Sequence, residues 1–556
     1  MFLSTLLSLA LSSAVQVHNP QIPVIVDRPC NVLSEITITC HSSAPLVDGT
    51  LEVELDGIDR KAVKSVRLLY TGTASPLISR TQSNIFKAHF NKWAGGWMDW
   101  CDGAYAKELS RVKPPKSGNV LLPFSTPLVS DRNIFYLSLE IDSRRVDLSS
   151  TFKCRVVSLT VQGPDGKEKL SLKEDGPVLR RMALSLRTHG DDGVDSYRIP
   201  GIVRTPKGTL LAVYDIRRDD SYDLNGDIDI GVSRSTDGGK TWEKMRVALD
   251  MGEAGGLPEG QNGVGDPCIL VDESTGEVFI AGIWAHGRYG GTAIFTSRTG
   301  TDPIDVAQMV LTKSSDDGKT WSKPVNITSQ VKDPSWSTAF QGPGNGICMK
   351  DGTLVFPFQW WDKDRVPTSG IIYSKDHGVS WQRSEGARSN VCEDQVVETE
   401  DGVLMLNMRN HATSDRFRKV SVTSDMGKTW SVHSSDSTLV EPVCQASLVK
   451  VEAKDNSTGK DLLLFCNPAS SKSRDRMTLR LSDDMGKTWK RSILLDEESG
   501  WGYSCICPID KDHVGVLYEG STAQLVFQTV RIDDLMDAYG TGPSPKPSIP
   551  HRPVPR

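Results

Sequence analysis

The octapeptide Ser235–Trp242, which reads STDGGKTW, decides the fold because it returns along the chain. Its hydroxyl residue, aspartate, glycine and tryptophan keep their positions in the further copies Ser314–Trp321, Ser374–Trp381, Thr423–Trp430 and Ser482–Trp489. The aspartate is suited to accept backbone N–H groups, the glycine to adopt positive φ, and the tryptophan to pack beneath the turn. Such a turn, repeated in register, predicts a repeated all-β unit.

The distances between the copies predict the type of repeat. The copies begin at residues 235, 314, 374, 423 and 482, which are 79, 60, 49 and 59 residues apart. Each interval has room for about four short strands with their loops, as in one blade of a β-propeller. We therefore predict that residues 181–541 form a six-bladed β-propeller in which one blade lacks the octapeptide.

The residues before the first octapeptide predict a second domain. Within residues 15–180, runs such as Thr50–Leu55 alternate polar and apolar side chains, which is typical of β-strands. We predict a β-sandwich there. The region also holds an aromatic cluster, Trp93, Trp97, Trp100 and Tyr105. These side chains either stack on sugar rings, which would make the sandwich carbohydrate-binding, or pack in the core or between the domains.

Both ends of the chain have distinctive compositions. Residues 1–14 are mostly apolar and end in small side chains, which predicts a signal peptide cleaved after Ala14 and a secreted or periplasmic protein. The alternative is a buried first strand or helix. Residues 542–556 are rich in proline and predict a disordered tail. No later stretch is apolar for long enough to span a bilayer.

Charge and cysteine content limit the partners and cofactors. The formal net charge of the 556 residues is −6, so the chain lacks the excess of positive charge typical of nucleic-acid-binding proteins. Its 11 cysteines contain no C-x-x-C pair, and we predict neither a metal site nor another cofactor. A Cys30–Cys40 disulfide is one option for an exported protein.

Three arginines stand in or beside apolar stretches. Arg198 lies at the start of one predicted strand, Arg409 ends another, and Arg474 lies between two more, with Arg476 and Arg480 as alternatives for the third position. Because a guanidinium group cannot lose its charge, a buried arginine needs an anion, which is either a protein carboxylate or a ligand. Each arginine alone fits a structural ion pair.

An acidic loop follows Arg217 and joins two predicted strands. A loop of this kind is able to present an aspartate over a central pocket, and its candidates are Asp219, Asp220 and Asp223. Without further information, a run of acidic residues is usually an ordinary solvated loop.

The octapeptides and the motif Tyr197-Arg198-Ile199-Pro200 resemble the Asp-boxes and the Arg-Ile-Pro motif of the sialidase (neuraminidase) family. A sandwich ahead of the propeller is similar to the arrangement in Bacteroides-type exo-α-sialidases. In that family three arginines bind the carboxylate of the sugar, and the resemblance assigns this role to Arg198, Arg409 and Arg474. Bidentate, charge-assisted hydrogen bonds suit a planar carboxylate.

The resemblance also implies the reacting groups. Residues 391–398 are similar to a family strand whose first glutamate, here Glu393, partners a tyrosine near the C-terminal end, here Tyr503. A neutral phenol suits a carbon that already bears a carboxylate, provided that Glu393 takes its proton. Sialidases with a tyrosine nucleophile are a known exception to the two-carboxylate scheme of glycosidases. The loop residue Asp223 is implied as the general acid and base.

The remaining implied residues surround the sugar. Arg217 contributes to the pocket, Asp266 contacts the N-acyl amide or O4, and Trp284 forms a wall for the acyl group. Glu519 is implied to orient Arg198. Asp266 and Trp284 also fit a turn aspartate and a core tryptophan.

The resemblance therefore implies a retaining exo-α-sialidase that removes terminal α-linked sialic acid from glycoproteins, glycolipids and oligosaccharides. One alternative is a trans-sialidase or intramolecular trans-sialidase, with Trp360 and Trp361 as an aromatic acceptor platform. The other is a propeller that binds sialylated glycans without turnover.

Overall fold

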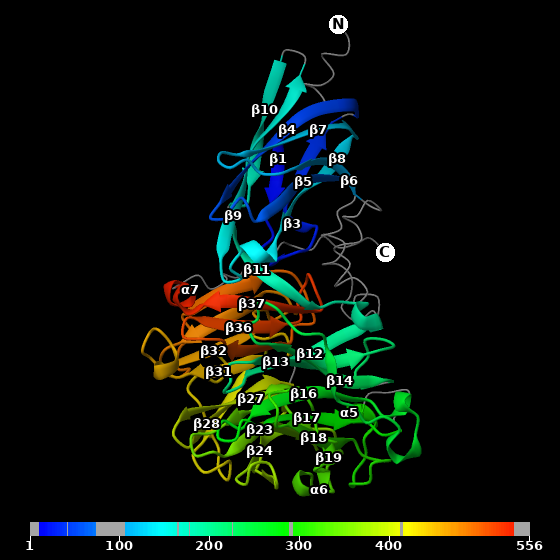
Figure 1. Ribbon diagram of the computed structural model, residues 1–556, viewed down its shortest axis with the longest axis vertical. Helices are drawn as coiled ribbons and strands as arrows, with labels where there is room; N and C mark the ends of the chain where they lie inside the picture. Colours follow the sequence, from blue (N-terminus) through cyan, green and yellow to red (C-terminus); the bar gives the residue numbers. More distant parts are fainter. Residues whose placement is uncertain are drawn as a thin grey trace.

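Strands make up almost all the regular structure of the chain. The computed structural model describes residues 11–41, 43–73, 106–163, 166–176, 178–224, 226–287, 293–411 and 415–538. Residues 1–10 of the predicted signal peptide, the aromatic cluster at residues 93–105 and the proline-rich tail lie outside these ranges. Figure 1 shows the N-terminal strands, blue to cyan, stacked on the larger region that runs from green to red. No helix in the described ranges has the length and apolar character needed to cross a membrane.

Five sheets of the larger region stand as separate units and are arranged in chain order. The first contains β12 (Ser196–Arg204), β13 (Leu210–Arg217), β14 (Ile228–Ser235) and β15 (Arg246–Leu249). The second contains β16 (Val264–Val271), β17 (Val278–Trp284), β18 (Gln308–Ser314), β19 (Val325–Asn326) and β21 (Gly344–Asn345). The third contains β20 (Thr338–Gln341), β22 (Ile347–Cys348), β23 (Leu354–Trp361), β24 (Pro367–Ser374), β25 (Gln382–Arg383) and β26 (Arg388–Ser389).

The fourth and fifth sheets, like the first, consist of four antiparallel strands in chain order. The fourth contains β27 (Val391–Glu400), β28 (Val403–Asn410), β29 (Lys419–Thr423) and β30 (Ser431–Val432). The fifth contains β31 (Ser447–Val451), β32 (Leu462–Pro468), β33 (Met477–Ser482) and β34 (Arg491–Asp496). Short helices α5 (Ala293–Thr296), α6 (Thr328–Val331) and α7 (Ile532–Asp537) decorate the region.

The last three strands correct the prediction of six blades, because they do not form a separate sheet. β35 (Ser504–Pro508), β36 (His513–Tyr518) and β37 (Leu525–Arg531) pair with β11 (Val178–Arg187) inside a 14-stranded sheet. The second half of β11 pairs with β37, whereas its first half pairs with β9 of the N-terminal region. Within the described residues the propeller therefore has five separate blades. β35 contacts both β12 and β31, so this shared group lies between the last blade and the first.

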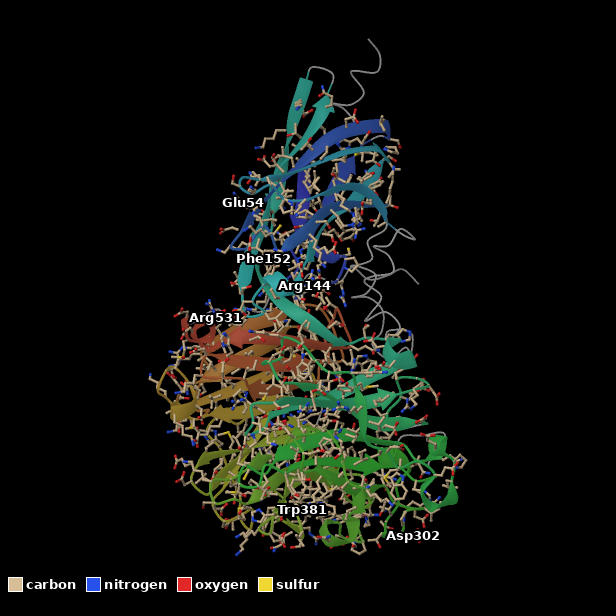
Figure 2. The ribbon with its side chains drawn as sticks, in the orientation of Figure 1. Glu54, Arg144, Phe152, Asp302, Trp381 and Arg531 are labelled. Atoms are coloured by element: carbon tan, nitrogen blue, oxygen red, sulfur yellow. The ribbon has the colours of Figure 1, made fainter. Side chains whose placement is uncertain are left out.

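The N-terminal region surrounds a hydrophobic core of its own. Its strands are β1 (Leu11–His18), β2 (Val24–Ile25), β3 (Asn31–Cys40), β4 (Ala44–Asp56), β5 (Val63–Gly72), β6 (Lys107–Val112), β7 (Val120–Leu128), β8 (Asp131–Ile141), β9 (Thr151–Gly163) and β10 (Gly166–Glu174). Leu33, Leu51 and Phe152 are part of this core, and Figure 2 labels Phe152 there and Trp381 in the lower region.

Two details of this region bear on the sequence predictions. β1 begins at Leu11 and therefore includes Ala14, at which the predicted signal peptide ends. Cys40 is a free thiol, whereas Cys30 is disulfide-bonded. The predicted option of a Cys30–Cys40 disulfide is therefore wrong.

Each octapeptide forms the turn between the third and fourth strands of its sheet. In all five copies the aspartate accepts the N–H of the residue four positions later, at 2.8–3.0 Å. The glycine has φ between 75° and 88°, a conformation that a residue with a Cβ adopts only with strain. The tryptophan of the third copy, Trp381, is buried, and the others are partly buried. These turns join the last strands of each blade, whereas Arg198 and Glu393 lie on the first strands of their blades, β12 and β27.

Candidate active site

Arg198 lies on β12 in a distorted part of the strand. The pairing of β12 with β13 shifts between Arg198 and Gly201, and Ile199 has φ 58°, which is unusual for a β-branched residue. The Arg198 guanidinium donates to Glu519 at 3.0 and 3.2 Å and to Asp223 at 3.3 Å. The distortion thus directs a charged side chain from an otherwise buried strand toward two carboxylates.

Glu519 ties the beginning of the propeller to its end. Besides Arg198, its carboxylate accepts the N–H of Ile199 at 2.9 Å and the N–H of Tyr503 at 3.0 Å. Its side chain is only 1% exposed, so these charge-assisted bonds are made in a largely desolvated place. This is the contact expected of a carboxylate that orients Arg198.

The acidic loop brings Asp223 to the same place. Arg217, at the end of β13, donates to Asp223 at 2.6 Å, and its other nitrogens donate to the buried Asp215 at 3.1 and 2.8 Å. Asp220, in contrast, accepts the N–H of Tyr222 within the loop. The structure therefore places Asp223, among the three loop candidates, against Arg198 and Arg217.

The protonation of Asp223 follows from these neighbours. Desolvation by the surrounding chain raises the pKa of Asp223, but the positive charges of Arg217 and Arg198 outweigh it and lower the pKa to about 2. The Asp223 side chain is still 54% exposed, so it remains open to a ligand. In the free protein Asp223 is thus an anion at neutral pH.

Tyr503 and Glu393 form the second half of the site. The Tyr503 hydroxyl donates to Glu393 at 2.5 Å, and Arg409 donates to Glu393 at 2.5 Å and to the Tyr503 oxygen at 3.0 Å. Glu393 lies at a bulge of β27 and has φ 38°. The bulge turns this glutamate toward the residue that precedes β35, far away in the sequence.

Burial affects the two partners differently. Burial, together with the charge of Glu393, raises the pKa of the Tyr503 phenol well above its usual range. Burial also raises the pKa of Glu393, but Arg409 and the hydrogen bond from Tyr503 outweigh it and lower that pKa. A neutral phenol therefore donates to an ionised carboxylate.

Arg474, the first choice for the third arginine, lies beside Tyr503. Its guanidinium donates to the carbonyl oxygens of Trp501 at 2.9 Å and Val443 at 3.3 Å, and it lies 5.5 Å from the Tyr503 ring centre. The rival Arg480 is buried elsewhere and donates to Asn467. Arg198 lies 5.3 Å from the same ring, so all three arginines meet at Tyr503.

Asp266 and Trp284 have different surroundings. Asp266 has φ 54°, its N–H donates to Asp215 at 2.8 Å, and burial together with Asp215 and Asp223 raises its pKa well above the usual range. Trp284 is 7% exposed and packs in the core between the first two blades, where its indole N–H donates to Asn262. The structure does not bring Trp284 into contact with the charged cluster, and its role as a wall stays a prediction.

The proposed acceptor platform is not an open surface. Trp360 is 8% exposed and stacks on Trp336 with 4.5 Å between ring centres. Trp361 is 6% exposed and packs against His411 and Phe295. Both tryptophans are therefore mainly core residues.

Sequence reasoning missed two contributors to the cluster. The Trp501 ring lies 4.2 Å below the Arg198 guanidinium, a cation–π contact that holds the arginine from its face. Asp215 is fully buried and binds both Arg217 and the main chain of Asp266. A charged residue inside an apolar strand was the signal used for Arg198, and the same signal would have found Asp215.

An all-β propeller that gathers three guanidinium groups around a phenol–carboxylate pair has the fold and site of a glycoside hydrolase. Residues 199–507 match the BNR repeat-like domain, and residues 12–164 match the N-terminal domain of BNR-repeat neuraminidase. The chain belongs to the sialidase family of glycoside hydrolases.

The relatives cover both regions of the chain. A Bacteroides fragilis sialidase is 44% identical over 96% of this chain and 98% of its own length. A Micromonospora viridifaciens sialidase is 34% identical over 65% of this chain and 54% of its own. The solved Hadza microbial sialidase Hz136 is 43% identical, covers 94% of this chain and 100% of its own, and superposes with a TM-score of 0.84. This similarity supports sialidase activity.

Proposed function

We propose that the protein is an exo-α-sialidase that hydrolyses terminal α-linked sialic acid with retention of configuration, outside the cytoplasm as residues 1–14 predict. The observation that carries the proposal is the 2.5 Å hydrogen bond from Tyr503 to Glu393 at the meeting point of Arg198, Arg409 and Arg474. Its natural substrates would be sialylated glycoproteins, glycolipids and oligosaccharides.

The three arginines would bind the carboxylate of the sugar. Arg474 suits this role best in the free protein, because its hydrogen bonds go to main-chain carbonyls and leave its charge uncompensated by them. Arg198 and Arg409 already hold carboxylates, and so the ligand would share them with Glu519 and Glu393. A planar, bidentate anion is the ligand that such a group of guanidiniums selects.

Binding of that carboxylate would also prepare Asp223 as an acid. In the free site Arg198 and Arg217 hold Asp223 as an anion. A ligand carboxylate would offset part of this positive charge and exclude water, and both effects raise the pKa of a carboxyl group. Asp223 would then carry a proton and donate it to the glycosidic oxygen as the bond breaks.

In the first chemical step the Tyr503 oxygen would attack the anomeric carbon. Its proton passes to Glu393, and the bond from the anomeric carbon to the glycosidic oxygen breaks while that oxygen takes the proton of Asp223. In the second step water attacks the same carbon, Asp223 accepts a proton from that water, and Glu393 returns a proton to the departing Tyr503 oxygen. Two displacements at one carbon give net retention.

The direct test follows the first product formed from α-2,3- or α-2,6-sialyllactose by NMR. We expect free α-sialic acid to appear first and to mutarotate afterwards. First release of the β-anomer would contradict a retaining mechanism. An anhydro or transferred product would identify a trans-sialidase, which the burial of Trp360 and Trp361 does not favour. Binding without any product would identify a lectin.

A further inference from the structure

The hairpin that carries the acidic loop contains two aspartate–arginine pairs, each with a buried aspartate. Asp215 and Arg217 lie on β13, and both side chains are 0% exposed. On the other pair, Asp229 of β14 binds Arg218 at 2.5 Å, with side-chain exposures of 3% and 35%. The two pairs frame the same loop but face different surroundings, which makes them a natural comparison.

Asp215 uses both of its carboxylate oxygens. One accepts two N–H groups of Arg217, at 3.1 and 2.8 Å, and the other accepts the N–H of Asp266 at 2.8 Å. β16 comes very close here, since a Cβ on Gly265 would lie 3.0 Å from that second oxygen. Asp215 therefore fixes an arginine and the strained main chain of Asp266 at once.

Arg217 connects Asp215 to the acidic loop. The nitrogen that does not bind Asp215 donates to Asp223 at 2.6 Å and to the carbonyl oxygen of Ser221 at 2.8 Å. The chain of contacts thus runs from Asp215 through the Arg217 guanidinium to Asp223. Because the guanidinium is rigid and planar, its orientation at one end determines the position that it offers at the other.

We propose that Asp215 is a positioning residue of the sialidase reaction, which holds Arg217 and offsets its charge so that Asp223 is placed to protonate the leaving oxygen. The proposal rests on the proposed function, because it requires Asp223 to act as the acid. Asp215 hydrogen-bonds to Arg217 and to the main chain of Asp266, and it would act on Asp223 through Arg217.

The protonation of Asp223 depends on the charged groups that act on it and on Arg217. Arg217 of β13, Arg198 of β12 and Arg474 after β32 are positive, whereas Asp215 and Asp266 are acidic. Removing the negative charge of Asp215 leaves the positive charge of Arg217 without that partner. Arg217 then attracts Asp223 more strongly and stabilises its anionic form. Asp223 then loses its proton at a lower pH in the substrate complex.

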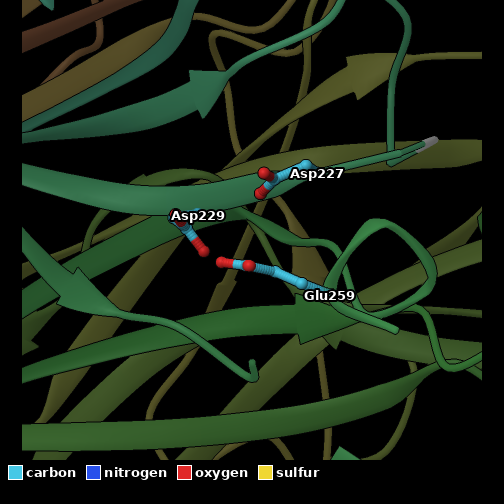
Figure 3. Close-up of side chains that lie close together, drawn as sticks. All are labelled: Asp227, Asp229 and Glu259. Atoms are coloured by element: carbon cyan, nitrogen blue, oxygen red, sulfur yellow. The ribbon is translucent and has the colours of Figure 1, made fainter. Parts of the chain in front are cut away.

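The second pair supplies the control. Arg218 binds Asp227 as well as Asp229, and Figure 3 shows these two aspartates beside Glu259, with one carboxylate oxygen of each within 4.8 Å of the others. Arg218 forms ion pairs with two of these three acidic groups. Asp229 is nonetheless nearly as buried as Asp215 and binds an arginine of the same hairpin.

The experiment compares Asp215→Asn with Asp229→Asn on sialyllactose, by pH profiles of kcat and kcat/KM together with melting temperatures. For Asp215→Asn we expect kcat to fall on the order of 100-fold, as for a displaced catalytic group. We also expect the basic limb of its kcat profile to move to lower pH. Asp229→Asn should have a lower melting temperature than the wild type, but the basic limb of its kcat profile should stay at the wild-type pH.

The proposal would be overturned if Asp215→Asn lost no more kcat than Asp229→Asn and the basic limb of its kcat profile did not move. If Asp215→Asn does not fold, Arg217→Lys provides the second test. This variant keeps the positive charge beside Asp215, but one ammonium group cannot span Asp215 and Asp223 as the fork does. Wild-type kcat in Arg217→Lys would equally overturn the proposal. A wild-type protein that releases no sialic acid would defeat the proposed function itself, and the inference with it.

Discussion

The octapeptide turns and the charged cluster around Tyr503 are built on opposite principles. Within the first octapeptide, Ser235 bonds Asp237 two residues away and Asp237 bonds Thr241 four residues away. In the cluster, Arg198 and Glu519 are 321 residues apart, and Tyr503 and Glu393 are 110 apart. The turns are local and repeated, whereas the cluster is long-range and occurs once.

Both regions contain residues with positive φ, but at different kinds of position. The octapeptides have it at the glycine in every copy, and in four copies also at the residue before the glycine, namely Asp317, His377, Met426 and Met485. The cluster has positive φ at Ile199, Asp266 and Glu393, where a side chain makes that conformation costly. The octapeptide positions lie in turns between strands, whereas these three positions lie within β12, β16 and β27. Positive φ thus shapes a repeated turn in one region and redirects a single side chain into the site in the other.

Tyr503→Phe should break the cluster and leave the turns intact, with the largest effect. We expect turnover of sialyllactose to fall on the order of 10⁴-fold, which corresponds to about 5.4 kcal/mol of transition-state stabilisation. Sialic acid should still bind, since the arginines remain. Tyr214→Phe is the matched control, because that buried hydroxyl bonds Ser233 and Arg187 away from the cluster. Wild-type turnover in Tyr503→Phe would exclude Tyr503 as the nucleophile.

Glu519→Gln should damage both stability and function, because Glu519 joins the ends of the propeller. Breaking the buried ion pair with Glu519 leaves Arg198 with the longer, 3.3 Å contact to the half-exposed Asp223, so we expect the free energy of unfolding to fall by about 3–5 kcal/mol. Urea unfolding measures this, and isothermal titration with sialic acid should show weakened binding.

A variant away from the charged cluster separates the effect of Glu519→Gln on stability from its effect on function. Asp317→Asn breaks the buried pair of Asp317 with Arg234, at 2.8 Å, between the first two blades. It should lower stability and leave kcat/KM unchanged. If Asp317→Asn lost activity to the same extent as Glu519→Gln, the octapeptide turns and the charged cluster would not have separate roles.

Asp484→Ala should affect one turn only. The Asp484 carboxylate accepts the N–H and hydroxyl of Thr488 and the hydroxyl of Ser482, at 2.9, 2.6 and 2.6 Å. Loss of such a local cap costs about 0.5–2 kcal/mol. We therefore expect a lower urea midpoint with unchanged turnover, and Asp483→Ala, on the neighbouring exposed position, as the control. A change of kcat in Asp484→Ala would show that the turns do contribute to the chemistry.

Acid should weaken the turns in a gradual way, the smallest effect expected. The hydroxyl and N–H of Ser380 hold the pKa of Asp376 at about 2, and the N–H and hydroxyl of Thr429 do the same for Asp425. These folded pKa values lie below the unfolded value of about 3.9, so their stabilisation is present above about pH 4 and is lost as the pH falls toward 2. Asp376→Asn/Asp425→Asn should lose less stability between pH 5 and pH 2.5 than the wild type, and an equal loss would contradict this.

The limits of sequence prediction follow the same division. The octapeptide pattern predicted the turns, the all-β fold and the propeller, because its hydrogen bonds join residues within one short stretch. Its spacing predicted six blades, although the last strands share β11 with the N-terminal region. A spacing shows how much chain each unit contains, but it does not show which strand edges finally pair.

The sequence by itself determined which residue types the protein has for its chemistry, namely arginines in apolar strands, an acidic loop and a tyrosine near the end. Only the tertiary structure decided that Asp223 rather than Asp220 reaches Arg198, that Trp284 packs in the core, and that Asp215 supports the loop from beneath. The physical reason is that a side chain's protonation and contacts depend on neighbours from other blades, and folding alone brings these together.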